Sequence, residues 1–428
     1  MRHLILSILV LSLFFFSGCQ KDGCQKIIEQ EGYKPVYMSF EEFRSSVKTV
    51  APQPIHNPGK IYKKDAYLLI NEKNQGIHIV DNSQPSNPQK LSFIKIPGNI
   101  DISVKGDVLY ADSFIDLLTL DISDPTNVKV LDRKKDVFGY NPHQFTPYEG
   151  PYSTKIDRDK GVVIDWKKGV ITNEVNCESS SNPGFSIESS SFDAGQASSA
   201  SGSQTTSGQG GSMARFAISS NYLYTVRGEK LQVFGISSPT NPNHVADEMI
   251  NRNIETIFIN EPHLYIGAQD GMHIFSIETP NAPSYLSTFE HVQVCDPVVV
   301  KDDFAYVTLR GSGDCGRSIN QLDIVDITDK SDPTLKRSYP MNEPFGLGID
   351  GDNLFVCDRG PGIRVYNTED TPQLEQINEI AVNKPYDVIP VNDLLMVTTE
   401  NAIYQYDYSN SSSISELSEL PVEDDPLR

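Results

Sequence analysis

The sequence is short of positive charge and contains none of the motifs by which the common enzyme classes are identified. Its 428 residues include 36 Lys and Arg against 57 Asp and Glu, and the formal net charge is -21. A surface this acidic repels phosphate backbones, so we expect no nucleic-acid partner. HExxH, GxSxG, Walker and EF-hand patterns are all absent. The residues therefore point to no particular class of enzyme.

Cysteine is also scarce, and its spacing argues against a thiolate metal site. No CxxC pair and no Cys/His cluster with zinc-like spacing occurs. Apart from Cys19, which is discussed below, the number of cysteines is odd, so at least one has no partner within the chain. The remaining cysteines are Cys24, Cys177, Cys295, Cys315 and Cys357.

Long apolar runs are missing from the chain beyond its N-terminus, where a membrane-spanning helix would need about 20 apolar residues. Residues 4–16 form a shorter apolar run, which follows Arg2 and His3 and is interrupted only by two serines. A short run of this kind is typical of the core of an export signal. We therefore place a signal peptide at residues 1–18.

Phe16-Ser17-Gly18-Cys19 resembles the lipobox of bacterial lipoproteins, although Phe16 stands where the family usually has Leu. The resemblance implies that Cys19 becomes the lipidated N-terminus, with acyl chains such as palmitate anchoring the protein to the bacterial outer membrane. Residues 20–22 resemble the short charged signal that sends some lipoproteins to the cell surface. An ordinary secretory signal cleaved nearby is the alternative. Residues 19–54 are then a tether and lead-in.

One short pattern recurs along the rest of the chain. It is an apolar strand that ends in an acidic or small residue, which we call the marker, before a turn rich in Asp, Ser, Asn and Pro. Most markers are 40 to 50 residues apart, and one interval is 114 residues. The seven markers are Asp81, Asp121, Gly235, Ser276, Asp326, Asn367 and Asp407. An Asp, Asn or Ser at this position is expected to cap the strand end by accepting backbone amides of the turn.

The chain between markers reads as strand, turn, strand, so each unit of about 40 residues has four short strands. Four strands at this period are typical of a propeller blade, in which small twisted sheets pack around an axis. We therefore predict an all-β fold, a seven-bladed β-propeller over residues 55–420, followed by an acidic tail at 421–428. An open β-sandwich is the competing architecture, but it does not predict an even period.

The marker strands resemble the LVIVD repeat of bacterial propeller proteins, as in residues 77–81, Ile-His-Ile-Val-Asp. Residues 305–308 are also similar to the start of the related YVTN-type repeat. The resemblance extends over about residues 55–420 outside the long interval. It implies a propeller exported to the cell envelope, and it implies no established activity.

The long interval contains an insertion, which we place at residues 135–212. Its second part, 178–212, is so rich in Ser and Gly and so poor in apolar residues that we predict a disordered loop. Its first part, 138–175, reads as an added hairpin or extended arm. In a four-stranded blade the first strand begins on one side of the ring, here called the top face. The second-to-third loop and the link to the next blade lie on the same face, and so does the insertion.

The fifth blade has extra residues, 310–320, in its second-to-third loop, and Cys315 lies there. Cys295 opens the first strand of the same blade, so both cysteines belong to the top face. We predict a Cys295–Cys315 disulfide, provided that the loop folds back within bridging distance.

Aligning the blades places a set of charged residues where the first strands begin, around the axis of the ring. They are Asp101, Arg215, Glu255, Asp296 and Asp387, and two further blades have Gly59 and Gly346 there. Such a group could form an acidic site for calcium, an amine or a basic peptide segment. The alternative is that these residues cap the turns between blades.

Two functions from different classes follow. The first is a non-catalytic binding or scaffold module for an envelope protein or polysaccharide. The second is a metal-assisted hydrolase or lyase that uses the axial carboxylates. The fold does not decide between them, because propellers host both.

Overall fold

The computed structural model describes residues 25–143, 146, 150–176, 209–210, 212, 214–250, 254–291, 297–311 and 319–424. The chain divides into two units. Unit 1 comprises Met1–Ser39 and Pro142–Ser190, and unit 2 comprises Phe40–Asn141 and Ser191–Arg428. Each is described by itself.

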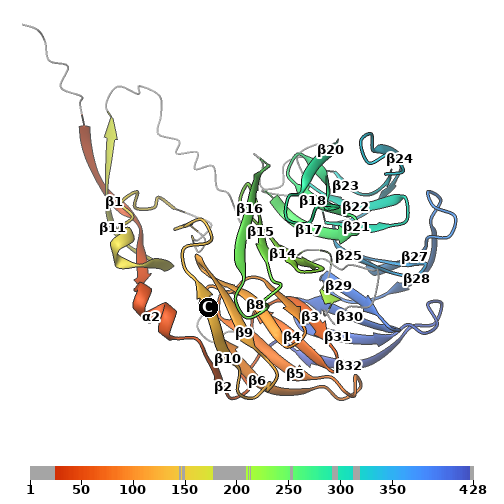
Figure 1. The fold of residues 1–428 in the computed structure, drawn as a ribbon, viewed down its shortest axis with the longest axis horizontal. Helices are drawn as coiled ribbons and strands as arrows, with labels where there is room; N and C mark the ends of the chain where they lie inside the picture. The colour runs from red at the N-terminus through yellow and green to blue at the C-terminus, as the bar shows by residue number, and fades with distance from the viewer. Residues whose placement is uncertain are drawn as a thin grey trace, which may run out of the picture. The chain divides into compact units, whose positions relative to one another are not determined.

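Unit 2 is a seven-bladed β-propeller, as the marker period predicts. Its blades follow one another around the ring from the orange to the blue end of the chain (Figure 1). Blades 1 to 4 consist of β3 (Pro58–Lys64), β4 (Tyr67–Glu72), β5 (Gly76–Asp81) and β6 (Gln89–Lys95); β7 (Ile102–Lys105), β8 (Val108–Ser113), β9 (Asp116–Asp121) and β10 (Lys129–Lys134); β13 (Phe216–Ser219), β14 (Tyr222–Arg227), β15 (Lys230–Gly235) and β16 (Asn243–Met249); and β17 (Ile254–Asn260), β18 (His263–Ala268), β19 (Gly271–Ser276) and β20 (Ser284–Glu290).

The other three blades repeat this order. They consist of β21 (Val298–Lys301), β22 (Phe304–Arg310), β23 (Asn320–Asp326) and β24 (Thr334–Pro340); β25 (Pro344–Asp350), β26 (Asn353–Asp358), β27 (Gly362–Asn367) and β28 (Glu375–Ile380); and β29 (Pro385–Val391), β30 (Leu394–Thr399), β31 (Ala402–Asp407) and β32 (Ser415–Pro421). Every blade is antiparallel, with the marker at the end of its third strand.

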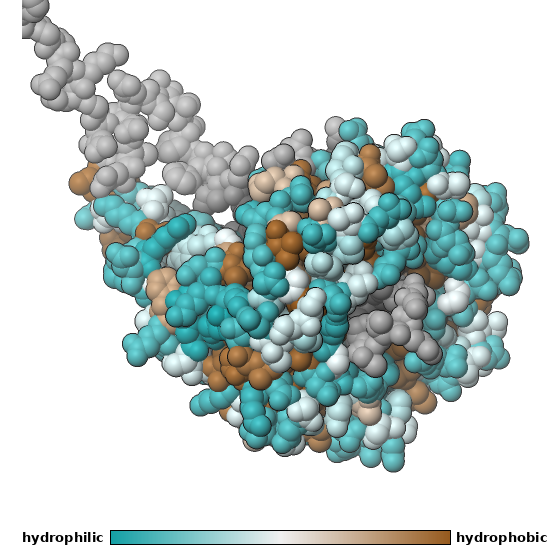
Figure 2. All heavy atoms as spheres, viewed as in Figure 1, coloured by the Kyte–Doolittle hydropathy of each residue, from teal (hydrophilic) through white to brown (hydrophobic). Residues whose placement is uncertain are grey.

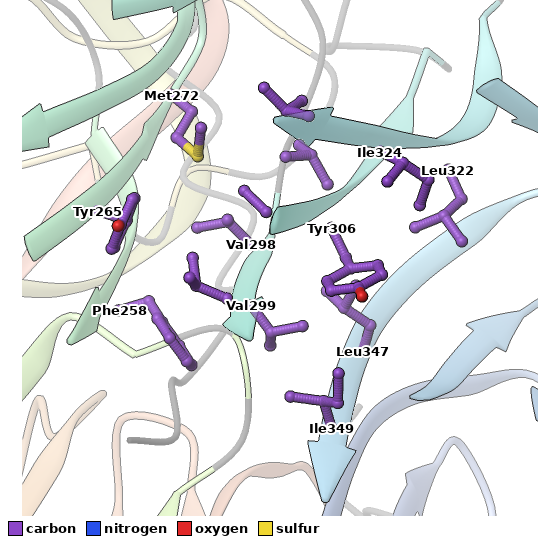
Figure 3. Packing of buried hydrophobic residues seen from close by; sticks show 14 of the residues in the cluster. Phe258, Tyr265, Met272, Val298, Val299, Tyr306, Leu322, Ile324, Leu347 and Ile349 are labelled. Atoms are coloured by element: carbon purple, nitrogen blue, oxygen red, sulfur yellow. The ribbon is translucent and has the colours of Figure 1, made fainter. Parts of the chain in front are cut away.

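The core lies between successive blades, because both faces of each inner strand are covered. Val298 and Val299 on β21 are buried with Tyr265 of blade 4 and with Leu347 of blade 6 in one cluster. Figure 3 shows these side chains filling the space between neighbouring sheets. The outermost strands are mostly exposed. Most of the face shown in Figure 2 is accordingly hydrophilic.

The markers cap their turns as predicted. The side chain of Asp81 accepts the amide of Ser83 at 2.9 Å, and Asp121 accepts that of Ser123 at the same distance. Asp326, Asn367 and Asp407 make the equivalent bond two residues ahead. These turns lie on the side of the ring opposite the top face, here called the bottom face.

The lead-in is built into the ring. The short strand β2 (Lys48–Val50) pairs with β6 at the outer edge of blade 1. Ile55 bridges to Val422, and its carbonyl accepts the amide of Glu423 at 2.7 Å, which joins the two ends of the propeller chain. Residues 48–54, predicted to be part of the tether and lead-in, therefore help to close the ring together with Ile55.

A short helix, α2 (Phe40–Ser45), docks on blade 2 before β2 begins. The guanidinium of Arg44 donates to both carboxylate oxygens of Asp116, at 2.8 and 3.0 Å. Arg133 donates to Asp116 as well, at 3.0 Å. Phe43 is fully buried and meets Phe114 edge to face. The helix thus has a fixed place on the top face.

Unit 1 contains the extended arm that the insertion predicts, but half of it comes from the N-terminal segment. The strand β1 (Gln25–Met38) pairs antiparallel with β11 (Val162–Asn176), and a short 3-10 helix, Arg158–Lys160, precedes β11. Trp166 is buried on β11 and packs against Tyr152 and His143. Sequence patterns could not predict this pairing, because it joins segments more than a hundred residues apart.

Candidate functional site

The candidate site lies at the axis of the ring, where the first strands begin. Asp101 precedes β7 and forms an ion pair with Lys60 of β3, and both side chains are buried. The amide of Ile102 donates to Asp101 at 2.6 Å, and the amide of Arg215 donates to its other oxygen. One cation and two amides therefore satisfy this carboxylate.

Asp387 on β29 is also buried, and no side chain in the described part of the chain donates a hydrogen bond to its oxygens. Burial raises the pKa of Asp387 to about 7. The amides of Val388 and Ser212 and the charge of Lys60 oppose this shift. A Cβ added to Gly346 would come within 2.5 Å of Asp387, so only glycine leaves this carboxylate room. Asp387 is thus enclosed by backbone and about half protonated at pH 7.

Because Lys60 is buried beside Asp101, the residues at the axis carry both signs of charge and do not form a purely acidic site. Desolvation lowers the pKa of Lys60 to about 8, and the charge of Asp101 limits the shift. The alignment of the blades points to its neighbour Gly59, so no sequence pattern indicates a cation at this position. The Nε of Arg215 is buried beside this group and has no hydrogen-bond partner among the residues that the structure describes.

A second set of carboxylates, at the ends of second strands, caps the links between blades. Asp112 accepts the amides of Ile100 and Asp101, at 2.7 and 2.9 Å. Glu72 accepts the amides of residues 56 and 57, and Asp358 accepts those of residues 342 and 343. Arg227 pairs with Asp112 at 3.3 Å. Because three blades share this arrangement, it is structural.

The axis is occupied by the end of the chain's own insertion. The strand β12 (Gln209–Gly210) pairs with β3 along the inner edge of blade 1. The hydroxyl of Ser212 accepts the amide of Leu347 in blade 6 at 2.8 Å, and Ala214 accepts the amide of Ile257 in blade 4 at 2.7 Å. Ser212 is completely buried. We call the described residues at this end of the insertion the axial segment. They contact inner strands on several sides of the ring and are Gln209, Gly210, Ser212, Ala214 and Arg215.

The predicted site residues are only partly brought together. Asp101 contacts Arg215 through its backbone, and Asp387 lies within electrostatic range of Lys60. Glu255 is half-buried on β17. Asp296, Cys295, Cys315 and Cys19 lie outside the described residues, so the disulfide and the lipidation stay predictions. Within the predicted loop 178–212, Gln209, Gly210 and Ser212 belong instead to the axial segment.

Among the described residues, no three His, Cys, Asp or Glu side chains come together as a metal ion would require. Calcium stays a prediction, because Asp296 is not among them. Within the same ranges, no helix has both the length and the apolar composition needed to cross a membrane.

Arginines and aromatic rings alternate on the top face near the axis. Arg310 of β22 and Arg359, which follows β26, stack on the ring of Phe345, with the guanidinium carbons 4.0 and 3.9 Å from its centroid. Arg359 also lies 5.6 Å from the ring of Tyr386, and Lys73 lies 5.1 Å from the same ring. This cation–aromatic stack spans blades 5, 6, 7 and 1. No repeat or motif in the sequence indicates it.

Comparison with known families bears on the blades themselves. The sequence model of the LVIVD repeat family matches residues 61–93, 99–133, 210–247 and 294–340. The chain carries LVIVD repeats. The matched LVIVD segments coincide with blades 1, 2, 3 and 5, and the structure shows that the other three blades have the same four-stranded form. A search of curated proteins gave no significant match.

Solved structures share the fold of these LVIVD repeats at low sequence identity. The computationally designed Ika8 protein is 9% identical, with 88% of this chain and 92% of that chain covered and a TM-score of 0.50. A protein from Lactobacillus plantarum is 10% identical, with 85% and 98% covered and a TM-score of 0.50. BamB from Moraxella catarrhalis is 8% identical, with 90% and 98% covered and a TM-score of 0.48. Identities this low concern the fold alone.

Proposed function

We propose that this chain is an envelope lipoprotein whose propeller binds an envelope protein through its top face, without catalysis. The occupied axis carries the proposal. The axial segment fills the positions at which a ligand would reach the inner strands, and Asp101 is already satisfied by Lys60 and by two amides. Asp101 is buried and paired, and Asp387, although its pKa of about 7 would suit a general acid, is fully buried and enclosed by backbone. Neither carboxylate is therefore poised to attack or protonate a substrate. Binding is then left to the loops that surround the axis.

The top face is the better candidate for binding because its features differ from blade to blade. The bottom face repeats the same capped turns, in which the marker side chains are used to hold the backbone. The top face carries the docked helix α2, the cation–aromatic stack and the end of β10, after which the insertion begins. Variation at one end of a rigid scaffold is typical of binding loops.

We propose further that Cys19 is the lipidated residue and that the lipid attaches the chain to the outer membrane. The lipobox resemblance supports this, and mass spectrometry of the N-terminal peptide tests it. An acylated Cys19 is expected. An unmodified N-terminus at another residue would contradict the proposal.

The binding function is tested by photo-crosslinking with two variants of one blade. Gln75 lies in the second-to-third loop of blade 1, on the top face, and Gln84 lies in the marker turn of the same blade. Both side chains are exposed. A benzophenone side chain at position 75 should capture a protein in envelopes of the producing organism, whereas the same group at position 84 should capture none. Equal capture at both positions, or no capture at position 75, would contradict the proposal.

A further inference from the structure

Arg359 is held rigidly on the top face without the hydrogen bonds that such a residue usually makes. It follows β26 in the second-to-third loop of blade 6, and its guanidinium stacks between the rings of Phe345 and Tyr386. The side chain is 23% exposed. Stacking fixes the plane of the guanidinium and leaves its edge, where the donors lie, for other partners.

None of the five N–H donors of Arg359 has a hydrogen-bond acceptor in the part of the chain that the structure describes. Its Nε is buried and has no partner. The carboxylates of Glu343 and Glu400 come no nearer than 3.9 Å to its terminal nitrogens, which is beyond hydrogen-bond length. Glu400 is engaged with Lys384 at 2.6 Å. A largely buried guanidinium in this state is unusual in a folded protein.

The neighbours of Arg359 add positive charge in a chain that is strongly acidic overall. Arg310 also stacks on Phe345, with its guanidinium carbon 4.0 Å from the ring centroid. Lys73 lies against Tyr386, at the far end of the stack. Cations concentrated at this one place in a protein of net charge -21 would attract a small anionic group locally.

We propose that Arg359 binds a carboxylate in an acidic segment of a protein partner. The inference rests on the proposed function and names the chemistry of the partner at the same face. A planar guanidinium edge matches a carboxylate in bidentate fashion. A nucleic acid is disfavoured because a long polyanion would also lie against the acidic surface beyond this site, whereas a short acidic segment need contact only the cations here. A glycan is disfavoured because the stacked cations take up the faces of Phe345 and Tyr386 on which a sugar ring would lie.

The test measures binding of a fluorescein-labelled hexaglutamate peptide to the full mature chain by anisotropy, at low salt and neutral pH. Arg359→Gln removes the charge and the fork of donors, and it should weaken binding roughly tenfold or more. The matched control is Arg337→Gln, which removes an exposed arginine stacked on Tyr339 at the outer edge of blade 5. The control should change the affinity less than about twofold, since only the long-range charge is altered.

Arg359→Lys keeps the positive charge and serves as a second variant in case Arg359→Gln does not fold. It should bind more weakly than the parent, because an ammonium group cannot form the bidentate pair. Equal affinity of the parent and Arg359→Gln, or no binding by the parent, would overturn the proposal. Stronger binding of oligogalacturonate than of the peptide would overturn the choice of a protein partner. If crosslinking from position 75 persists in Arg359→Gln, the top-face function stands and only this site is wrong.

Discussion

The hydroxyl of Tyr110 in blade 2 donates a 2.8 Å hydrogen bond to the carbonyl of Pro239 in blade 3. Tyr224 repeats this bond one blade further on, to the carbonyl of Pro280. In both cases the acceptor lies in the Pro-containing turn that follows a marker. The turn of one blade therefore also holds the preceding blade, through the carbonyl of its proline.

Tyr110→Phe should lower the free energy of unfolding by about 1 kcal/mol, because the carbonyl of Pro239 loses its donor. Tyr265 provides the control, since it stands at the same place in blade 4 and its buried hydroxyl has no partner in the described ranges. Tyr265→Phe should be neutral or slightly stabilising. Urea denaturation of both variants checks this, and equal losses would show that the bond to Pro239 is not what stabilises the contact.

Asp387→Asn should raise the free energy of unfolding above that of the parent, and this gain should be larger at neutral pH than at acid pH. The pKa of Asp387 is raised to about 7 by burial, so the folded chain keeps a proton that the unfolded chain releases above its ordinary pKa of 3.8. The parent therefore loses stability as the pH rises from about 4 to 7, on the order of 4 kcal/mol at most. Asparagine does not ionise and avoids this loss.

The measurement is urea denaturation of parent and variant between pH 4 and pH 8. Asp81→Asn is the control, because hydrogen bonds from Ser83 lower the pKa of Asp81 from its ordinary value of 3.8. Its titration therefore lies below this range, and the difference in stability between that variant and the parent should change little between pH 4 and pH 8. An effect of Asp387→Asn that does not change with pH would contradict the assignment.

The fold was predictable because its signal is local and repeated. Each marker strand ends at a capped turn, and the cap depends on residues only two positions apart, as in Asp81 and Ser83. The pairing of β1 with β11 and the placement of the axial segment were not predictable, because each joins segments distant in sequence. Nothing in the composition of residues 209–212 distinguishes them from the Ser/Gly-rich residues before them.

The candidate site was predictable only in part for the same reason. Alignment of the blades found Asp101 and Asp387, because each begins or lies near the start of a first strand. It missed Lys60, which is one residue past the aligned Gly59, and it therefore missed the neutralising charge. Arg359 was missed because its stacking partners come from two different first strands.

Removing Asp116 should be more damaging than removing either of its arginine partners. Arg44→Ala leaves Arg133 and the amide of Asp136 on the buried carboxylate, so we expect a loss of about 1 kcal/mol. Asp116→Asn leaves Arg133 without a counterion and Arg44 with only the exposed Asp136, and should cost about 3 kcal/mol. Urea denaturation gives the two values. A larger loss for Arg44→Ala would show that α2, rather than the carboxylate, carries the stability.

Thiol chemistry tests the predicted disulfide against a described internal control. Cys357 is free and buried, and burial raises the pKa of its thiol well above the ordinary value. It should not react with a thiol reagent until the protein unfolds. Peptide mapping without reductant should recover the peptides of Cys295 and Cys315 joined. A free thiol at either position in the native protein would rule the disulfide out.

The axial segment lies against the inner strands at the ring axis, so binding is expected at the top face. Amide hydrogen exchange at Leu347 measures this contact, because the amide of Leu347 donates to the hydroxyl of Ser212. We expect slow exchange at Leu347 in the parent and faster exchange in Ser212→Ala, with Val356 on the neighbouring strand unchanged. Exchange at Leu347 in the parent as fast as in an exposed turn would contradict the claim.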